Sequence, residues 1–105
     1  MKFATIHTVH NEHLANFYFT KDAAALARQC MQQGLYTAHH PIMSSPWLEG
    51  ESVAEEMFDL TNNPGRQAER VQLYGRGRSV SVGDIVETEG SFYLCCGTGW
   101  EVVTM

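Results

Sequence analysis

The stretch DIVETEGSFYLCCGTGWEVVT, residues 84–104, decides the fold class. It contains three short runs of β-branched, aromatic and other apolar residues, and two glycine-containing breaks separate them. The breaks are Glu89-Gly90 and Gly97-Thr98-Gly99. Short strands joined by such turns are typical of antiparallel sheets. The stretch therefore predicts a three-strand antiparallel meander near the end of the sequence.

The beginning of the sequence predicts two more strands. Residues 2–9 are rich in β-branched and aromatic residues, and residues 14–20 contain the run Phe-Tyr-Phe. Between them, residues 10–13 read His-Asn-Glu-His and supply turn residues. This order predicts an N-terminal β-hairpin that joins the same sheet.

Two helices are predicted between the hairpin and the meander. The first is capped by Thr20 or Asp22 and ends at Gly34, because its apolar residues recur at the i, i+3, i+4, i+7 and i+8 spacing of one helix face. The second begins at Ser52, which has Glu55 three residues later in the spacing of a capping box. It ends before the Asn-Asn-Pro run.

The remaining segments are predicted to connect these elements. Residues 36–50 contain two prolines and are expected to form a loop that holds Trp47 against the core. Residues 71–74 are expected to form a short strand inside a glycine-rich and arginine-rich loop. A chain of 105 residues suits one domain of ordinary size. The sequence thus predicts a single α+β domain over residues 1–105, with two helices packed on an antiparallel sheet.

Charge is distributed unevenly along the sequence. Twelve Asp and Glu against seven Lys and Arg give a formal net charge of −5. This balance argues against a general binder of nucleic acid or of anionic membranes, because both need a positive field. Residues 49–59 and 84–105 carry acidic residues and no basic one, whereas four arginines fall together in residues 66–78. Acidic faces beside one arginine-rich loop favour a protein partner over a long polyanion.

The cysteines and the short apolar runs predict the compartment. The three cysteines, Cys30, Cys95 and Cys96, form an odd set, and adjacent cysteines on a strand point to opposite faces and cannot bridge without strain. No 18 apolar residues run together, and no apolar run of signal length opens the sequence. We therefore expect a cytoplasmic protein with reduced thiols, no membrane segment and no cofactor.

The second half of the sequence carries an ordered set of short motifs. They are FDLTN at residues 58–62, RSVSVGDIV at residues 78–86, Tyr93, and Gly99-Trp100. Over about residues 51–103, this set resembles the YodL-like group of small bacterial, plasmid and phage proteins. The resemblance implies a protein carried on a mobile element, and it brings no catalytic residues.

The RSVSVGDIV motif admits two interpretations. In the structural one, Gly83 takes a positive φ in a tight turn and Asp84 accepts hydrogen bonds from backbone N–H groups. In the functional one, Arg78, Ser79, Ser81 and Asp84 line an exposed edge where a partner docks. The residue types favour the structural interpretation.

Histidines and cysteines raise the question of metal binding and catalysis. His7, His10 and His13 recur every third residue, but on a strand the first two point to opposite faces, and no Cys-x-x-Cys accompanies them. We therefore expect no metal site. A nucleophilic enzyme would pair Cys95 or Cys96 with a histidine, although two neighbouring strand cysteines are more simply one buried and one partly exposed residue.

Three functions remain open. The favoured one is a non-enzymatic protein-binding module, encoded by a mobile element, that inhibits or modulates a host protein complex, with an anti-CRISPR protein as one version. The second is a nucleic-acid-binding accessory protein that uses the Arg66–Arg78 loop, with Tyr74 stacking on a base. The third is a Cys/His enzyme. Tyrosine and arginine are enriched in the hot spots of protein interfaces, which supports the first of these functions. The predicted partner-binding residues are Arg66, Arg70, Tyr74, Arg76, Arg78, Glu51, Glu55, Glu56 and Asp59.

Overall fold

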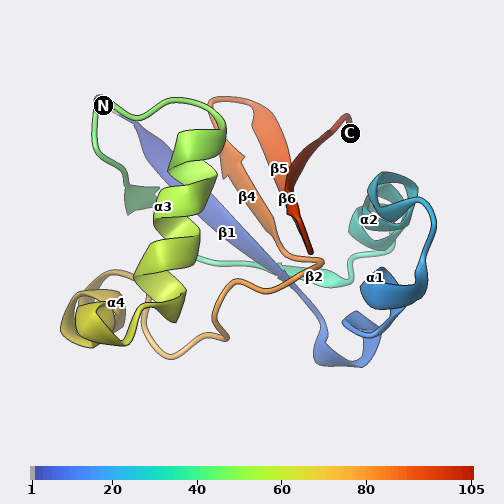
Figure 1. Ribbon diagram of the computed structural model, residues 1–105, viewed down its shortest axis with the longest axis horizontal. Helices are drawn as coiled ribbons and strands as arrows, with labels where there is room; N and C mark the ends of the chain where they lie inside the picture. Colours follow the sequence, from blue (N-terminus) through green and yellow to red (C-terminus); the bar gives the residue numbers. More distant parts are fainter. Residues whose placement is uncertain (1) are drawn as a thin grey trace.

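Figure 1 shows the computed structural model, which describes residues 2–105. The fold is an antiparallel sheet with helices on both of its faces. The sheet has six strands in the spatial order β2-β1-β4-β5-β6, and β3 also pairs with β1. The predicted α+β class is confirmed. The strands are β1 (Phe3–Val9), β2 (Tyr36–Ala38), β3 (Ile42–Met43), β4 (Ile85–Thr88), β5 (Ser91–Cys96) and β6 (Gly99–Val103).

The C-terminal meander is confirmed. β4, β5 and β6 pair in sequence order, with Val86 opposite Tyr93 and Cys95 opposite Trp100. The first turn places Glu89 and Gly90 at positive φ, as both central residues of a type I′ hairpin turn require. The glycine-containing breaks of the sequence therefore define this part of the sheet.

The predicted N-terminal hairpin is wrong. After β1 the chain forms a 3₁₀ turn, η1 (Asn11–His13), and a single helical turn, α1 (Asn16–Phe19). Both edges of β1 are already occupied, by β2 and β3 on one side and by β4 on the other, so no edge remains for a second N-terminal strand. Within α1, Phe17 is buried in the core, whereas Tyr18 and Phe19 are exposed.

The first predicted helix is confirmed as α2 (Ala23–Gln32). Asp22 caps it by accepting a hydrogen bond from the Ala25 amide at 3.0 Å, and Gly34 follows it with a φ of 71°. α2 packs on the face of the sheet that carries Val9, Ile85, Leu94 and Val103.

The other large helix, α3 (Glu51–Asn62), covers the opposite face and lies across β1 and β4 (Figure 1). Ile85 and Val86 are consecutive in β4 and belong to the two different cores, because alternate residues of a strand point to opposite faces. The core beneath α3 includes Ala4, Ile6, Val53, Met57, Leu60, Val86 and Cys95.

The predicted capping box at the start of α3 is wrong. Gly50 occupies the cap position with a φ of 57°, and Ser52 lies within the first turn without capping it. Glu55 is therefore free to contact another part of the molecule. No helix within residues 2–105 combines the length and the apolar composition that a membrane span requires.

The connecting segments differ from the prediction. Residues 36–50, expected as a loop, supply β2 and β3 to the sheet. Residues 71–74, expected as a strand, lie at the end of α4 (Gln67–Leu73), which follows a 3₁₀ turn, η2 (Pro64–Arg66). Trp47 is 79% exposed and does not pack against the core. Short apolar runs therefore did not distinguish strand from helix here.

Candidate functional site

The RSVSVGDIV motif forms a buried ion pair at the end of β1. The Asp84 carboxylate accepts hydrogen bonds from two backbone amides, those of Val9 at 2.9 Å and Ser81 at 2.8 Å. Arg78 donates to the same carboxylate with two nitrogens, at 2.6 and 2.9 Å, and to the Val9 carbonyl oxygen. A bidentate, charge-assisted pair fixes the orientation of both side chains. The motif thus fastens β1 to the turn that precedes β4.

These contacts support the structural interpretation of the motif. Asp84 is fully buried, so it does not line an exposed edge. Burial raises the pKa of its carboxyl, and the hydrogen bonds from Arg78 and the two amides oppose that rise only in part. Gly83 has a φ of 100°, and a Cβ at this position would lie 2.8 Å from a ring carbon of Phe17. Glycine is therefore required here both by the backbone and by the neighbouring ring.

The FDLTN motif contacts the same segment. The Thr61 hydroxyl accepts a hydrogen bond from the Val80 amide at 3.0 Å, and the Ser79 hydroxyl donates to the Thr61 carbonyl oxygen at 2.6 Å. Asn62 donates from its side-chain amide to the Val80 carbonyl oxygen at 2.9 Å. One internal hydrogen-bond network therefore joins the end of α3 to the segment before β4.

Arg70 and Tyr74 stabilise the glycine-rich loop from inside. Arg70 donates to the carbonyl oxygens of Thr61 and Gly77, and its guanidinium carbon lies 5.4 Å from the centre of the Tyr74 ring. The Tyr74 hydroxyl donates to the Arg78 carbonyl oxygen at 2.6 Å. Both side chains are half-buried, and their polar groups are used within the chain.

Arg66 is the centre of a surface ion-pair network. It contacts the carboxylates of Glu56 at 3.0 Å, Asp59 at 2.8 Å and Glu69 at 2.8 Å. These hydrogen bonds, with that of Glu69 the largest contribution, raise the pKa of Arg66. Of the four arginines in residues 66–78, Arg76 alone makes no side-chain hydrogen bond or ion pair within residues 2–105. Most arginines of this cluster therefore stabilise the fold through contacts within the chain.

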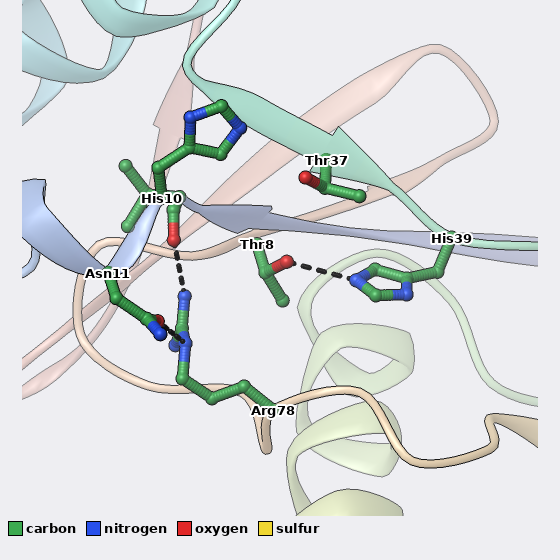
Figure 2. Close-up of a pocket in the computed structure, with 7 residues that line it drawn as sticks. Thr8, His10, Asn11, Thr37, His39 and Arg78 are labelled. Carbon is green, nitrogen blue, oxygen red and sulfur yellow. Dashed lines mark hydrogen bonds between the residues drawn. The ribbon is translucent and has the colours of Figure 1, made fainter.

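A hollow of about 310 Å³ lies beside Arg78, between the ends of β1 and β2 (Figure 2). Thr8 and His39 share a hydrogen bond of 2.9 Å on one side of it, and Arg78 donates to the Asn11 side chain at 2.9 Å on the other. Burial lowers the pKa of His39, which favours its neutral form, and Asp84 balances the charge of Arg78. These contacts leave no unbalanced charge in the hollow to attract an ion.

A second hollow, of about 190 Å³, lies between α3 and the β5–β6 turn, and we call it the α3–β6 crevice. The Phe58 and Trp100 rings meet there edge to face, with 6.4 Å between their centres and 88° between their planes. The Trp100 indole N–H donates a hydrogen bond to Glu55 Oε1. Cys95, Cys96 and the glycines of the turn complete its wall.

The predicted acidic residues divide into two sets on α3. Glu56 and Asp59 lie on the side toward α4 and pair with Arg66. Glu51 and Glu55 lie one turn apart and are exposed. Neither forms an ion pair within residues 2–105. The structure therefore leaves one pair of carboxylates on α3 without a neutralising cation.

The cysteine thiols are poorly suited to nucleophilic chemistry. Burial raises the pKa of Cys95 to about 12, and burial also raises the pKa of Cys96. The thiolate is the nucleophilic form of cysteine, so at neutral pH both side chains are almost entirely in the unreactive form. A neutral thiol is the form suited to the packed wall of the crevice.

The histidines His7 and His39 form hydrogen bonds with different side chains. His7 contacts Glu87 at 2.8 Å on one face of the sheet, whereas His39 bonds to Thr8 at the hollow beside Arg78. No group of three or more His, Cys, Asp or Glu side chains that could hold a metal ion occurs in residues 2–105. A zinc site needs three or four converging ligands.

Metal removal is expected to leave the stability of the protein unchanged. With excess EDTA, the thermal midpoint measured by circular dichroism should move by less than about 1 °C, because residues 2–105 contain no cluster of side chains that could hold a metal ion. Re-addition of Zn²⁺ should have no effect either. A midpoint lowered by more than about 3 °C and restored by Zn²⁺ would instead establish a structural metal site.

Sequence reasoning missed the α3–β6 crevice. Glu55 and Phe58 are three residues apart and share one side of a helix, which is a local signal for a joint surface. Their partner Trp100 lies 45 residues after Glu55, and no local pattern connects the two. The contact depends on how β6 is placed beside α3, and that placement is a property of the whole sheet.

Comparisons with protein-family models, with curated proteins and with solved structures give no match to this chain. The resemblance to the YodL-like group therefore stays a prediction.

Proposed function

We propose that this chain is a non-enzymatic protein-binding module, encoded by a mobile element, that inhibits or modulates a host protein complex. It acts in the cytoplasm, where its three cysteines stay reduced. An anti-CRISPR protein is one version of this function. The partner-binding surface is the exposed side of α3 that carries Glu51 and Glu55.

The distribution of available charge supports this proposal. Arg66, Arg70 and Arg78 use their guanidinium groups in internal contacts. Glu51 and Glu55 are exposed, and the chain carries a formal net charge of −5. The charge that a partner meets on α3 is therefore negative, and the complementary partner surface is basic. Such a module could occupy a channel that normally holds nucleic acid, because it offers the same sign of charge.

Two alternatives have less support. A nucleic-acid-binding protein would need arginines that reach phosphates, and most of the arginine loop is engaged within the chain. A Cys/His enzyme would need a thiolate, and the raised pKa values of Cys95 and Cys96 oppose its formation.

Removing the two carboxylates of α3 that form no ion pair within residues 2–105 should weaken partner binding about tenfold. We expect wild-type protein, immobilised and exposed to host lysate at low salt, to capture a basic protein that mass spectrometry identifies. The double variant Glu51→Gln/Glu55→Gln should capture about tenfold less, because it loses the charges that face the partner. The matched control Glu89→Gln/Glu101→Gln loses the same number of exposed carboxylates elsewhere and should capture as much as wild type.

Other outcomes would contradict the proposal in distinct ways. Equal losses from both double variants would mean that net charge matters and α3 does not. Retention of DNA or RNA, with affinity that falls steeply as salt rises, would favour the nucleic-acid-binding alternative. Loss of the biological effect in a folded Cys96→Ala variant that still captures the partner would favour the enzyme alternative.

A further inference from the structure

The α3–β6 crevice combines aromatic surface with an unpaired negative charge. The Phe58 and Trp100 rings meet edge to face, and that geometry occupies only one ring face of the pair. Further ring surface therefore remains for a third group. The negative face of an aromatic ring attracts cations, and tryptophan does so most strongly.

Glu55 is held at this crevice in a defined orientation. Its Oε1 accepts the hydrogen bond from the Trp100 indole N–H, which fixes the carboxylate beside the aromatic pair. Its Oε2 has no hydrogen-bond partner within residues 2–105. A carboxylate beside two rings, with no ion-pair partner among residues 2–105, favours a positively charged ligand.

The volume of the crevice and the free carboxylate oxygen of Glu55 indicate which kind of ligand fits. The crevice holds about 190 Å³, which suits a single side chain rather than a folded element. The free oxygen of Glu55 can accept a hydrogen bond from the compact ammonium group of a lysine. The methylene stem of a lysine can also lie along aromatic surface while its charged end reaches the carboxylate.

We propose that the α3–β6 crevice binds the side chain of a lysine presented by the partner protein, with its ammonium group at Glu55 Oε2 and its stem against Trp100 and Phe58. This inference rests on the proposed function and names the chemistry that the partner supplies. Glu51, one helical turn away, adds attraction at longer range without touching the lysine.

The test is a titration of ¹⁵N-labelled full-length protein with the peptide acetyl-Gly-Lys-Gly-amide, followed by NMR. We expect the Trp100 indole N–H and the Gly97 and Gly99 amides to shift in the direction of saturation, with a dissociation constant on the order of tens of millimolar, as suits one exposed cation–π contact and one exposed ion pair. The peptide with acetyllysine in place of lysine should give at least tenfold weaker binding. The Trp47 indole, away from the crevice, serves as the internal reference.

Two variants separate charge from structure. Glu55→Gln keeps an oxygen that accepts the indole hydrogen bond and removes the charge. The amide spectrum of this variant should show a folded protein, and the peptide titration should show that it binds lysine at least tenfold more weakly. Glu51→Gln removes the same charge one turn away and should weaken binding less than twofold. Wild-type affinity in Glu55→Gln, or equal binding of the acetyllysine peptide, would overturn the proposal.

This titration is independent of the lysate capture. If capture depends on Glu51 and Glu55 but no peptide shifts Trp100, the lysine crevice is wrong and the binding function stands. If the lysine peptide binds but no partner is captured, the crevice stands and the proposed function is wrong.

Discussion

Replacing Gly83 by valine should destabilise the protein by about 3 kcal/mol or more, a large part of the stability of a domain this size. The backbone at Gly83 has a φ of 100°, which side-chain-bearing residues rarely adopt. The new Cβ would also lie 2.8 and 2.9 Å from two ring carbons of Phe17, so the ring or the turn must move. Urea unfolding followed by circular dichroism measures the loss.

Gly90→Val is the matched control. Gly90 also has a positive φ, of 81°, but nothing lies within 4 Å of a Cβ placed there. Its substitution should therefore cost only the backbone strain, about 1–2 kcal/mol. Equal costs for the two variants would show that the Phe17 contact contributes nothing, and an unchanged midpoint for Gly83→Val would show that the turn is wrongly described.

Replacing Arg78 by methionine should cost about 3–5 kcal/mol at pH 7, because it leaves the Asp84 carboxylate buried without its counterion. Arg66→Met removes an arginine of similar exposure, 21% against 24% for the two side chains. Its partners are partly exposed, so we expect a loss of about 1 kcal/mol. Comparison of the two urea midpoints isolates the effect of burying the carboxylate.

The cost of Arg78→Met should also depend on pH. A carboxyl whose pKa is raised in the folded state binds its proton more readily there than in the unfolded chain, so its stabilising contribution is present at low pH and is lost as pH rises through the folded pKa. Without Arg78 this pKa rises further. The variant should therefore lose stability relative to wild type as pH rises above about 4, the ordinary pKa of an aspartate, and a pH-independent cost would contradict this account.

Elements with local signals could be predicted from the sequence. α2 has an apolar face of regular period, a capping Asp22 and a terminal Gly34, and the structure uses all three signals. The meander is defined by its two glycine-containing turns. In both cases the residues that determine the element lie within it or next to it.

Elements that depend on distant partners could not be predicted. β1 is paired by residues 36–43 and 85–88, and nothing in residues 10–20 indicates that both of its edges are taken. The arginine cluster was visible in the sequence, but its orientation was not. Arg78 bonds to the carbonyl oxygen of Val9, 69 residues away, and such a contact leaves no periodic trace.

The central place of β1 has a consequence for how the protein is made. β1 is synthesised before the other strands of this sheet, yet its Val9 amide bonds to Asp84, 75 residues later, at the start of the meander. Until that meander has been translated, β1 has no partner on one edge, and α3 has only part of the sheet to cover. Contacts between such distant segments slow folding, because a long loop must close before they form. We therefore expect this part of the nascent chain to stay unfolded until the meander has been translated and then to fold in one step, before which chaperones can bind its exposed apolar strand.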